Sequence, residues 1–262
     1  MRILFIGDVV GKPGRRIVTA VLPALRRELS ADLVIANGEN SAGGFGITHE
    51  TLEELLAAGV DVVTGGNHTW HAREAGVLLD SDPRLLRPAN YPPGTPGRGA
   101  GVFHTAGVPA AAVGVLNLEG RVFMQPLPSP FEVGREEAAR LRGEAAVVIV
   151  DFHAEATSEK IALGWYLDGR VSAVVGTHTH VQTADARVLP EGTAFITGVG
   201  MTGPRDSIIG MRREEILQRF LTLLPARFEV AGGPVQLNAV VLDVDEATGR
   251  ARGIERLSRV QE

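Results

Sequence analysis

The sequence predicts an α/β fold, and three observations support this prediction. The chain has 262 residues, of which 44% are hydrophobic and 22% charged, as in ordinary globular proteins. Apolar runs of strand length alternate with stretches of helical length. Polar side chains follow several of these runs directly. We find no linker, internal repeat or low-complexity segment, so we expect one domain spanning residues 1–262.

The first third of the chain alternates regularly between strands and helices. Short apolar runs typical of buried parallel strands occupy residues 3–6, 33–36 and 60–64. A helix is expected over residues 15–29, with Pro23 as a flaw or break. A second helix should begin after Thr48, a good N-cap, and end near Gly59.

The remainder combines loops, strands and helices. Residues 88–99 and 124–130 are rich in proline and are expected to be loops. Further strands are expected at residues 102–104, 111–116, 146–150, 171–175, 194–197, 235–244 and 252–257, and further helices at residues 131–142 and 159–167. Residues 245–249 resemble a hairpin turn that joins the last two strands.

Composition excludes several classes of protein. Without cysteine there can be no disulfide scaffold, thiolate metal site or cysteine nucleophile. The net charge of -5 argues against a broad nucleic-acid-binding surface, so no stable nucleic-acid partner is expected. The N-terminus lacks the features of a signal peptide. The longest uncharged stretch, residues 99–118, contains four glycines and is expected to form two strands and a turn. We therefore expect a cytoplasmic protein with no membrane partner.

Polar residues able to bind a metal ion recur where the predicted strands end. They are Asp8, Glu39, Asn40, Asn67, His68, His153, His178 and His180. In an open α/β sheet the carboxyl ends of the strands gather on one edge, where ligands bind. We therefore expect five separate segments to deliver these side chains to one crevice.

The chemistry of this set favours transition metals. Carboxylate, imidazole and amide donors without sulfur suit iron, manganese, zinc or nickel better than calcium. The donors exceed what one tetrahedral ion needs, whereas two ions about 3.5–4 Å apart, bridged by a carboxylate, would use them all. Two divalent ions and two carboxylates leave a positive charge, which would favour a phosphate ester as substrate.

Each candidate also has an ordinary structural explanation. Asp8 could be a strand-end cap, and Glu39 with Asn40 a solvated loop. His153 could be a satisfied core histidine. The joint occurrence at successive strand ends is what favours a metal site. Outside this set, His49 is expected at the surface and His71 at the edge of the site, while His104 has no functional support. Lys12, Arg15 and Arg16 either steer phosphate or lie on the surface.

Two motifs resemble signature blocks of the calcineurin-like metallophosphoesterases. They are Gly66-Asn67-His68 and Gly176-Thr177-His178-Thr179-His180, each after a predicted strand. Together with residues 7–11, 37–40 and 151–160, they resemble the YmdB-like family over residues 7 to about 203. Val10 replaces the histidine usual in the broader superfamily, and Glu39 replaces its bridging aspartate. His71 stands where an acidic residue is expected.

This resemblance implies a four-layer α/β/β/α sandwich of two mixed sheets flanked by helices. It also implies two divalent metal ions per chain, with iron first and manganese or another transition metal as the alternative. Asp8, Asn40 and His180 would hold the first ion, Asn67, His153 and His178 would hold the second, and Glu39 would bridge them. Members of the family tend to form homo-oligomers.

The activity that the resemblance implies is hydrolysis of cyclic nucleotides, with 2′,3′-cyclic nucleotides first. In this hypothesis a metal-bridging hydroxide attacks phosphorus, and a protonated His68, which is not a ligand, serves the leaving oxygen. Two alternatives remain open. One is a regulatory protein that binds a nucleotide or a partner, with incidental phosphoesterase activity. The other is a phosphomonoesterase that uses the same metals.

Overall fold

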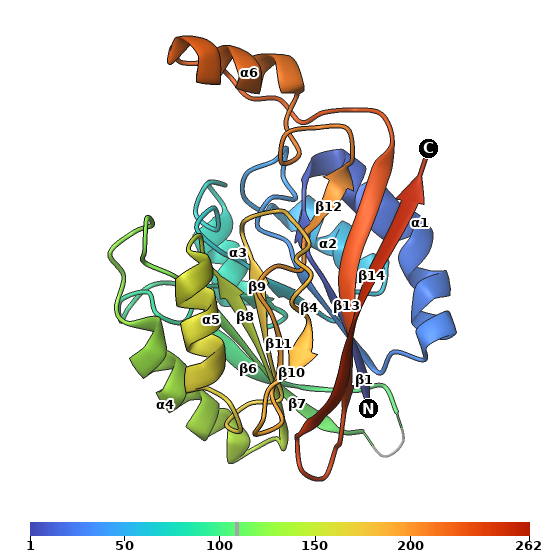
Figure 1. Cartoon of the computed structure of the whole chain (residues 1–262), viewed down its shortest axis with the longest axis vertical. Coiled ribbons are helices and arrows are strands. Elements are labelled where there is room, and N and C mark those ends of the chain that lie inside the picture. Colours follow the sequence, from blue (N-terminus) through green and yellow to red (C-terminus); the bar gives the residue numbers. More distant parts are fainter. Residues whose placement is uncertain (108–109) are drawn as a thin grey trace.

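The protein consists of two β-sheets packed face to face, with helices on both outer faces (Figure 1). The structure, a computed structural model, describes residues 1–107 and 110–262. The expected four-layer α/β/β/α sandwich with two mixed sheets is therefore confirmed.

The first sheet is 8-stranded and mixed, in the order β2-β12-β13-β1-β3-β4-β5, with β14 paired to β13. Its strands are β1 (Arg2–Ile6), β2 (Asp8–Val9), β3 (Leu33–Asn37), β4 (Val62–Thr64), β5 (Leu85–Leu86), β12 (Met201–Pro204), β13 (Val235–Val244) and β14 (Ala251–Gln261). The strands β1, β3, β4 and β5 run parallel, so β1, β3 and β4 end on the same side of the molecule.

The second sheet is 6-stranded, in the order β10-β11-β9-β8-β7-β6. Its strands are β6 (Ala100–His104), β7 (Ala112–Glu119), β8 (Val147–His153), β9 (Ala173–Thr177), β10 (Arg187–Val188) and β11 (Ala194–Ile196). The parallel strands are β7, β8, β9 and β11. Polar residues at the ends of β8 and β9 thus approach those at the ends of β3 and β4.

Helices cover the outer face of each sheet. The first sheet carries α1 (Gly11–Leu29), α2 (His49–Ala57) and α3 (Ala75–Ser81), and the second carries α4 (Pro130–Arg142) and α5 (Thr157–Tyr166). The last helix, α6 (Arg213–Thr222), stands away from both sheets at the top of Figure 1.

Alternate residues of each strand supply two different core layers. In β1, Ile3 and Phe5 face the second sheet, whereas Leu4 and Ile6 pack with the helices that cover the first sheet. This alternation is the period of two expected for a strand buried on both faces. The layer between the sheets includes residues from Ile3 to Ala251. On that ground we propose, as the sequence predicted, that residues 1–262 form one domain.

Several elements differ from the sequence prediction. The helix α1 begins at Gly11 rather than near residue 15, and it does not break at Pro23. Leu22 and Leu25 are buried against the first sheet, and this packing offsets the hydrogen bond that proline cannot make. The elements β2, β5, β10 and β12 were not expected, because strands of two to four residues carry no readable periodicity.

Other expectations are confirmed. Thr48 caps α2, where its hydroxyl accepts the Thr51 N–H. Residues 245–249 form the predicted turn, closed by the bond from Gly249 N–H to the Asp245 carbonyl. The strands β6 and β7 pair antiparallel, and the connection between them includes residues 108–109, which lie outside the described residues. Among the helices described, none is both long and apolar enough to span a bilayer.

Candidate metal centre

The predicted ligands come together, but from the ends of two sheets rather than from one edge of an open sheet. Asp8, Glu39, Asn40 and Asn67 follow or end strands of the first sheet. His153 ends β8, and His178 and His180 follow β9, all in the second sheet. The sequence predicted that these side chains meet in one crevice. They do so because the ends of two packed sheets lie next to each other.

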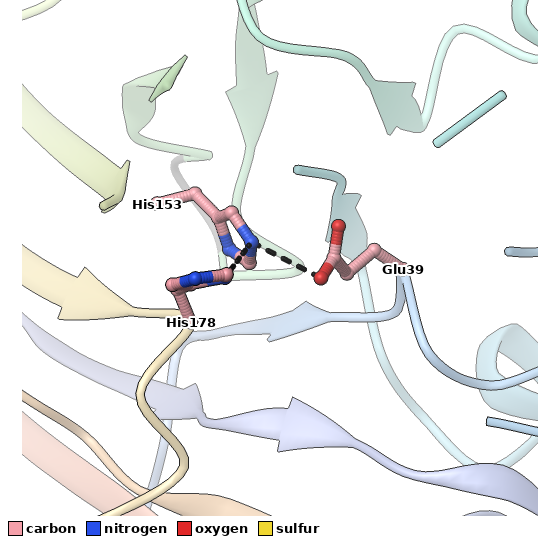
Figure 2. Close-up of side chains that lie close together, drawn as sticks. All are labelled: Glu39, His153 and His178. Atoms are coloured by element: carbon pink, nitrogen blue, oxygen red, sulfur yellow. Dashed lines mark hydrogen bonds and ion pairs between the residues drawn. The ribbon is translucent and has the colours of Figure 1, made fainter. Parts of the chain in front are cut away.

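His153 lies at the middle of the cluster. Figure 2 shows its imidazole between Glu39 and His178. The Nε2 atom of His153 lies 2.8 Å from Asn67 Oδ1, 3.0 Å from Glu39 Oε1 and 3.1 Å from His178 Nδ1. One imidazole nitrogen can donate at most one hydrogen bond, so hydrogen bonding alone does not satisfy three such neighbours.

The hydrogen bonds behind His153 fix its tautomer. Its Nδ1 lies 2.9 Å from the hydroxyl oxygen of Thr177, and that hydroxyl donates to Asp151 Oδ1 at 2.7 Å. Because the Thr177 proton is used toward Asp151, the hydroxyl must accept from His153 Nδ1–H. The Nε2 atom of His153 therefore presents a lone pair to the cluster, as in histidines that bind metals.

The other two histidines are oriented in the same way. His178 Nε2 lies 3.0 Å from Glu155 Oε2, and His180 Nδ1 lies 2.9 Å from the Ile209 carbonyl oxygen. Both partners are acceptors, so each of these nitrogens carries the proton. The lone pair of His178 is then on Nδ1, which faces His153, and that of His180 is on Nε2.

These inward lone pairs and the Glu39 carboxylate fit a cation. Burial lowers the pKa of His153 to about 3, and burial followed by the charge of His153 lowers the pKa of His178 to about 4. Both imidazoles are thus neutral at pH 7, which is the form that binds metal. Burial also raises the pKa of Glu39. An ion between Glu39, His153 and His178 would replace repulsion between lone pairs with attraction.

A second group of side chains, Asp8, Asn40 and His180, lies near Glu39. Asp8 Oδ1 is 3.8 Å from His180 Nε2, and Asp8 also accepts the backbone N–H of His178 at 3.1 Å. The amide nitrogen of Asn40 lies 3.2 Å from Glu39 Oε1 and 3.3 Å from His180 Nε2. To bind a cation, the Asn40 side chain would have to turn its oxygen inward, because the amide nitrogen is not a ligand.

His68 lies beside this cluster. Its backbone N–H donates to Glu39 Oε2 at 2.8 Å, and its ring lines a cavity of about 420 Å³ together with Phe45. Burial lowers the pKa of His68 to about 4, although Glu39 opposes this shift. The imidazole is therefore neutral at pH 7, which differs from the protonated form expected from the sequence.

The other singled-out residues lie outside the cluster. His49 and His104 are exposed, as is His71, whose ring lies 4.7 Å from that of His68. His71 therefore lies at the edge of the site, as expected. Arg15 pairs with Glu54 and donates to the Ser41 carbonyl, so it supports the turn after β3 rather than facing the cavity.

Sequence reasoning gave no role to the residues that orient the histidines. Asp151 and Thr177 stand behind His153, Glu155 pairs with His178, and the Ile209 carbonyl meets His180. Asp151 offered one signal, since it is a charged residue between apolar neighbours in a strand that continues to His153. The Ile209 contact offered none, because a backbone carbonyl leaves no trace in sequence.

Comparisons with known proteins show the family of this chain. The family model described as "YmdB-like protein" matches residues 4–257. A Bacillus subtilis protein named 2′,3′-cyclic-nucleotide 2′-phosphodiesterase is 53% identical over 257 residues, covering 98% of this chain and 96% of its own. A solved structure of a hypothetical protein from Thermus thermophilus superposes with a TM-score of 0.92 at 46% identity, covering 100% of both chains.

A more distant structure shows the fold. The calcineurin-like phosphoesterase YfkN from Bacillus subtilis matches with a TM-score of 0.55 at 11% identity, covering 100% of this chain and 90% of that chain. The fold is therefore that of the calcineurin-like phosphoesterases. Since the family model covers nearly the whole chain, this protein belongs to the YmdB-like protein family.

Proposed function

We propose that this protein is a dinuclear-metal-dependent phosphodiesterase that hydrolyses cyclic nucleotides, with 2′,3′-cyclic nucleotides as the preferred class. One observation carries the proposal. Imidazole lone pairs and a buried carboxylate converge within 3.1 Å of His153 Nε2, beside a cavity that His68 lines. The activity in the name of the 53% identical relative from Bacillus subtilis supports the choice of substrate.

The proposed ligands divide into two groups that share Glu39. Asp8, Asn40 and His180 would hold one ion, and Asn67, His153 and His178 the other. The contacts of Glu39 Oε1 with both Asn40 and His153 support a bridging role. Iron is the first choice and manganese the alternative, because the donors are nitrogen and oxygen without sulfur. When bound, such ions neutralise phosphate charge and supply a hydroxide nucleophile near neutral pH.

His68 would serve the leaving oxygen. A neutral imidazole still carries one N–H, so His68 can donate a hydrogen bond to the ribose oxygen as its bond to phosphorus breaks. The negative charge that develops on the phosphate would also raise the pKa of this imidazole, so that it could take up a proton from solvent and pass it to the leaving oxygen. Cleavage at the 2′ oxygen would yield a nucleoside 3′-phosphate with a free 2′ hydroxyl.

The test of this proposal is His68→Ala in metal-loaded protein. We expect the metal content per chain to stay unchanged and turnover of 2′,3′-cyclic AMP to fall by about 10²–10⁴. His49→Ala, at an exposed histidine, is the control. Loss of metal from His68→Ala would show that His68 is a ligand. Unchanged turnover would remove its role in the reaction.

Two other functions use the same residues. A phosphomonoesterase would prefer p-nitrophenyl phosphate to bis-p-nitrophenyl phosphate and 2′,3′-cyclic AMP, whereas we expect the diesters to be preferred. A regulatory protein would bind a nucleotide without turning it over. A metal-loaded protein that binds 3′-AMP but hydrolyses none of these esters would favour that function.

We also propose a homo-oligomer in which α6 packs against α6 of a second copy. Its apolar residues Leu217, Phe220 and Leu221 are spaced i, i+3, i+4 and so share one face, and Phe220 and Leu221 are 72% and 83% exposed. Glu214 lies in its first turn and Arg219 in its last, so an antiparallel pair would bring opposite charges together.

The oligomer is tested by the molar mass in solution. We expect Leu221→Glu to give a monomer by light scattering, while Val77→Glu, an exposed valine on α3, leaves the mass unchanged. Wild-type protein that is monomeric would contradict the proposal. The cytoplasm is the proposed location, supported by the absence of cysteine.

A further inference from the structure

The cavity beside the candidate metal centre has two chemically different kinds of lining residue. One kind is the charged and polar residues already described. The other kind is Phe45, Ile209, Met211, Ile216 and Phe228, none of which has a nitrogen or oxygen atom in its side chain. A cavity of about 420 Å³ with both polar and apolar lining residues suits an amphipathic ligand.

The apolar lining residues come from separate segments of the chain. Phe45 comes from the turn after β3, where Gly44 and Gly46 have φ values of +100° and +82°. Ile209 comes from the loop after β12, and Phe228 from the chain beyond α6. The structure therefore brings apolar residues from distant parts of the chain to the same cavity.

The backbone of Ile209 is strained. Ile209 and Gly210 have φ values of +48° and +98°, and Ile208 and Met211 exchange two backbone hydrogen bonds of 3.0 Å. This is the pattern of a tight two-residue hairpin loop, in which glycine or asparagine is favoured at both central positions. A β-branched residue with positive φ is uncommon, and such strain concentrates at functional sites.

Ile209 contacts a proposed metal ligand and also lines the cavity. Its carbonyl oxygen lies 2.9 Å from His180 Nδ1, and the residue is 54% exposed. Glycine at this position would keep the carbonyl contact and relieve the strain. What isoleucine adds is an apolar surface that faces the cavity.

We infer that this apolar wall, formed by Phe45, Ile209 and Phe228, holds the nucleobase of the substrate while the cyclic phosphate faces the metal ligands. This inference rests on the proposed function. Phe45 also lies edge-on to the His68 ring, at 4.9 Å between centroids, so a base against Phe45 leaves the ribose near His68. Aromatic side chains bind any base by its face, without reading its edge.

Weak discrimination between bases follows from this wall. Among the polar lining residues outside the proposed ligands, Glu155 contacts His178, Thr179 accepts a bond from Lys160, and His68 is assigned to the leaving oxygen of the ribose. An apolar surface separates similar ligands far less than a hydrogen-bonding one. We expect kcat/KM for the four 2′,3′-cyclic nucleotides to differ by about tenfold or less, with purines preferred because they stack over a larger area.

The experiment compares ligands with and without a base. In manganese-loaded Phe228→Ala, we expect calorimetric affinity for 3′-AMP to fall by about tenfold or more, while affinity for inorganic phosphate and the metal content stay at wild-type values. Ile209→Gly should show the same selective loss. Phe131→Ala, at a half-buried phenylalanine of α4, is the matched control and should bind both ligands normally.

The outcomes separate this inference from the proposed function. The inference would be overturned if both variants lost as much affinity for phosphate as for 3′-AMP, or if neither variant lost affinity. A preference in kcat/KM above about 100-fold for one base would also overturn it. Wild-type protein that hydrolyses no cyclic nucleotide would instead refute the proposed function. A selective loss for 3′-AMP, in a wild type that hydrolyses all four substrates, supports both.

Discussion

Replacing Gly66 by alanine would place a methyl group inside the candidate metal centre. The new Cβ would lie 2.4 Å from His153 Cδ2 and 2.5 Å from Glu39 Oε2. Ordinary contacts begin near 3.5 Å, so these two side chains would have to retreat by about 1 Å. Metal sites tolerate deviations of only about 0.2 Å in ligand distance. We therefore expect the affinity for manganese to fall by about 100-fold, which is the upper end of the range of losses seen when the orientation of metal ligands is disturbed.

The assay for Gly66→Ala is titration calorimetry with manganese on metal-free protein, with bound metal measured by mass spectrometry. Gly253→Ala is the matched control, because a Cβ at Gly253 has no neighbour within 4 Å. The crowding should cost about 1–3 kcal/mol of unfolding free energy, which urea denaturation in chelator would measure. A folded Gly66→Ala protein with wild-type metal affinity would contradict this prediction, because His153 and Glu39 would then have moved without any loss of binding.

Two further predictions concern carboxylates near the site. Glu39→Gln should lose at least one metal ion per chain, measured by mass spectrometry, and unchanged content would remove the bridging assignment. Glu119, at the end of β7, is buried, and neither of its oxygens has a hydrogen-bond partner among the described residues. Burial first, and then Glu39, raise its pKa to about 8, so the folded state favours the protonated form and loses stability as pH rises from about 4.5 to 8. In chelator, Glu119→Gln and wild type should therefore have the same free energy of unfolding at pH 4.5, measured by urea denaturation. Above pH 8 the variant should be more stable by up to about 5 kcal/mol. An equal difference in unfolding free energy at both pH values would contradict this prediction.

Much of the fold could be predicted because most elements carry a local signal. The run that forms β13 matched its bounds of Val235–Val244, and α4 was placed within one residue of its start at Pro130. Local patterns do not reveal which strands pair. The division into two sheets depends on long-range pairing, such as that of β1 with β13. That part of the fold came from the family resemblance. The helix α6 was not predicted, although Leu217, Phe220 and Leu221 have helical spacing; it stands away from both sheets, and these three residues are exposed.

The candidate site was predictable to the extent that its chemistry lies at strand ends. His153 and His178 were found because residue type and position both pointed to metal binding. Their protonation was not predictable, because it depends on Thr177 and Glu155 in space. A protonated His68 was expected because the reaction needs a proton donor, and the surroundings of the residue were not considered. Burial lowers its pKa, so His68 is neutral in the protein without substrate.

The position of the site between the two sheets links metal binding to the stability of the sandwich. Glu39 follows β3 of the first sheet and His153 ends β8 of the second, and they lie 3.0 Å apart with water excluded. Without a cation, lone pairs and carboxylates at such distances repel, and the apolar layer between the sheets must hold them together. A cation would convert this repulsion into a bond between the sheets, and any free energy of binding to the folded state adds to folding. The rigid sandwich thus orients the ligands, and the metal in turn stabilises the end of the sandwich where the reaction is proposed to occur.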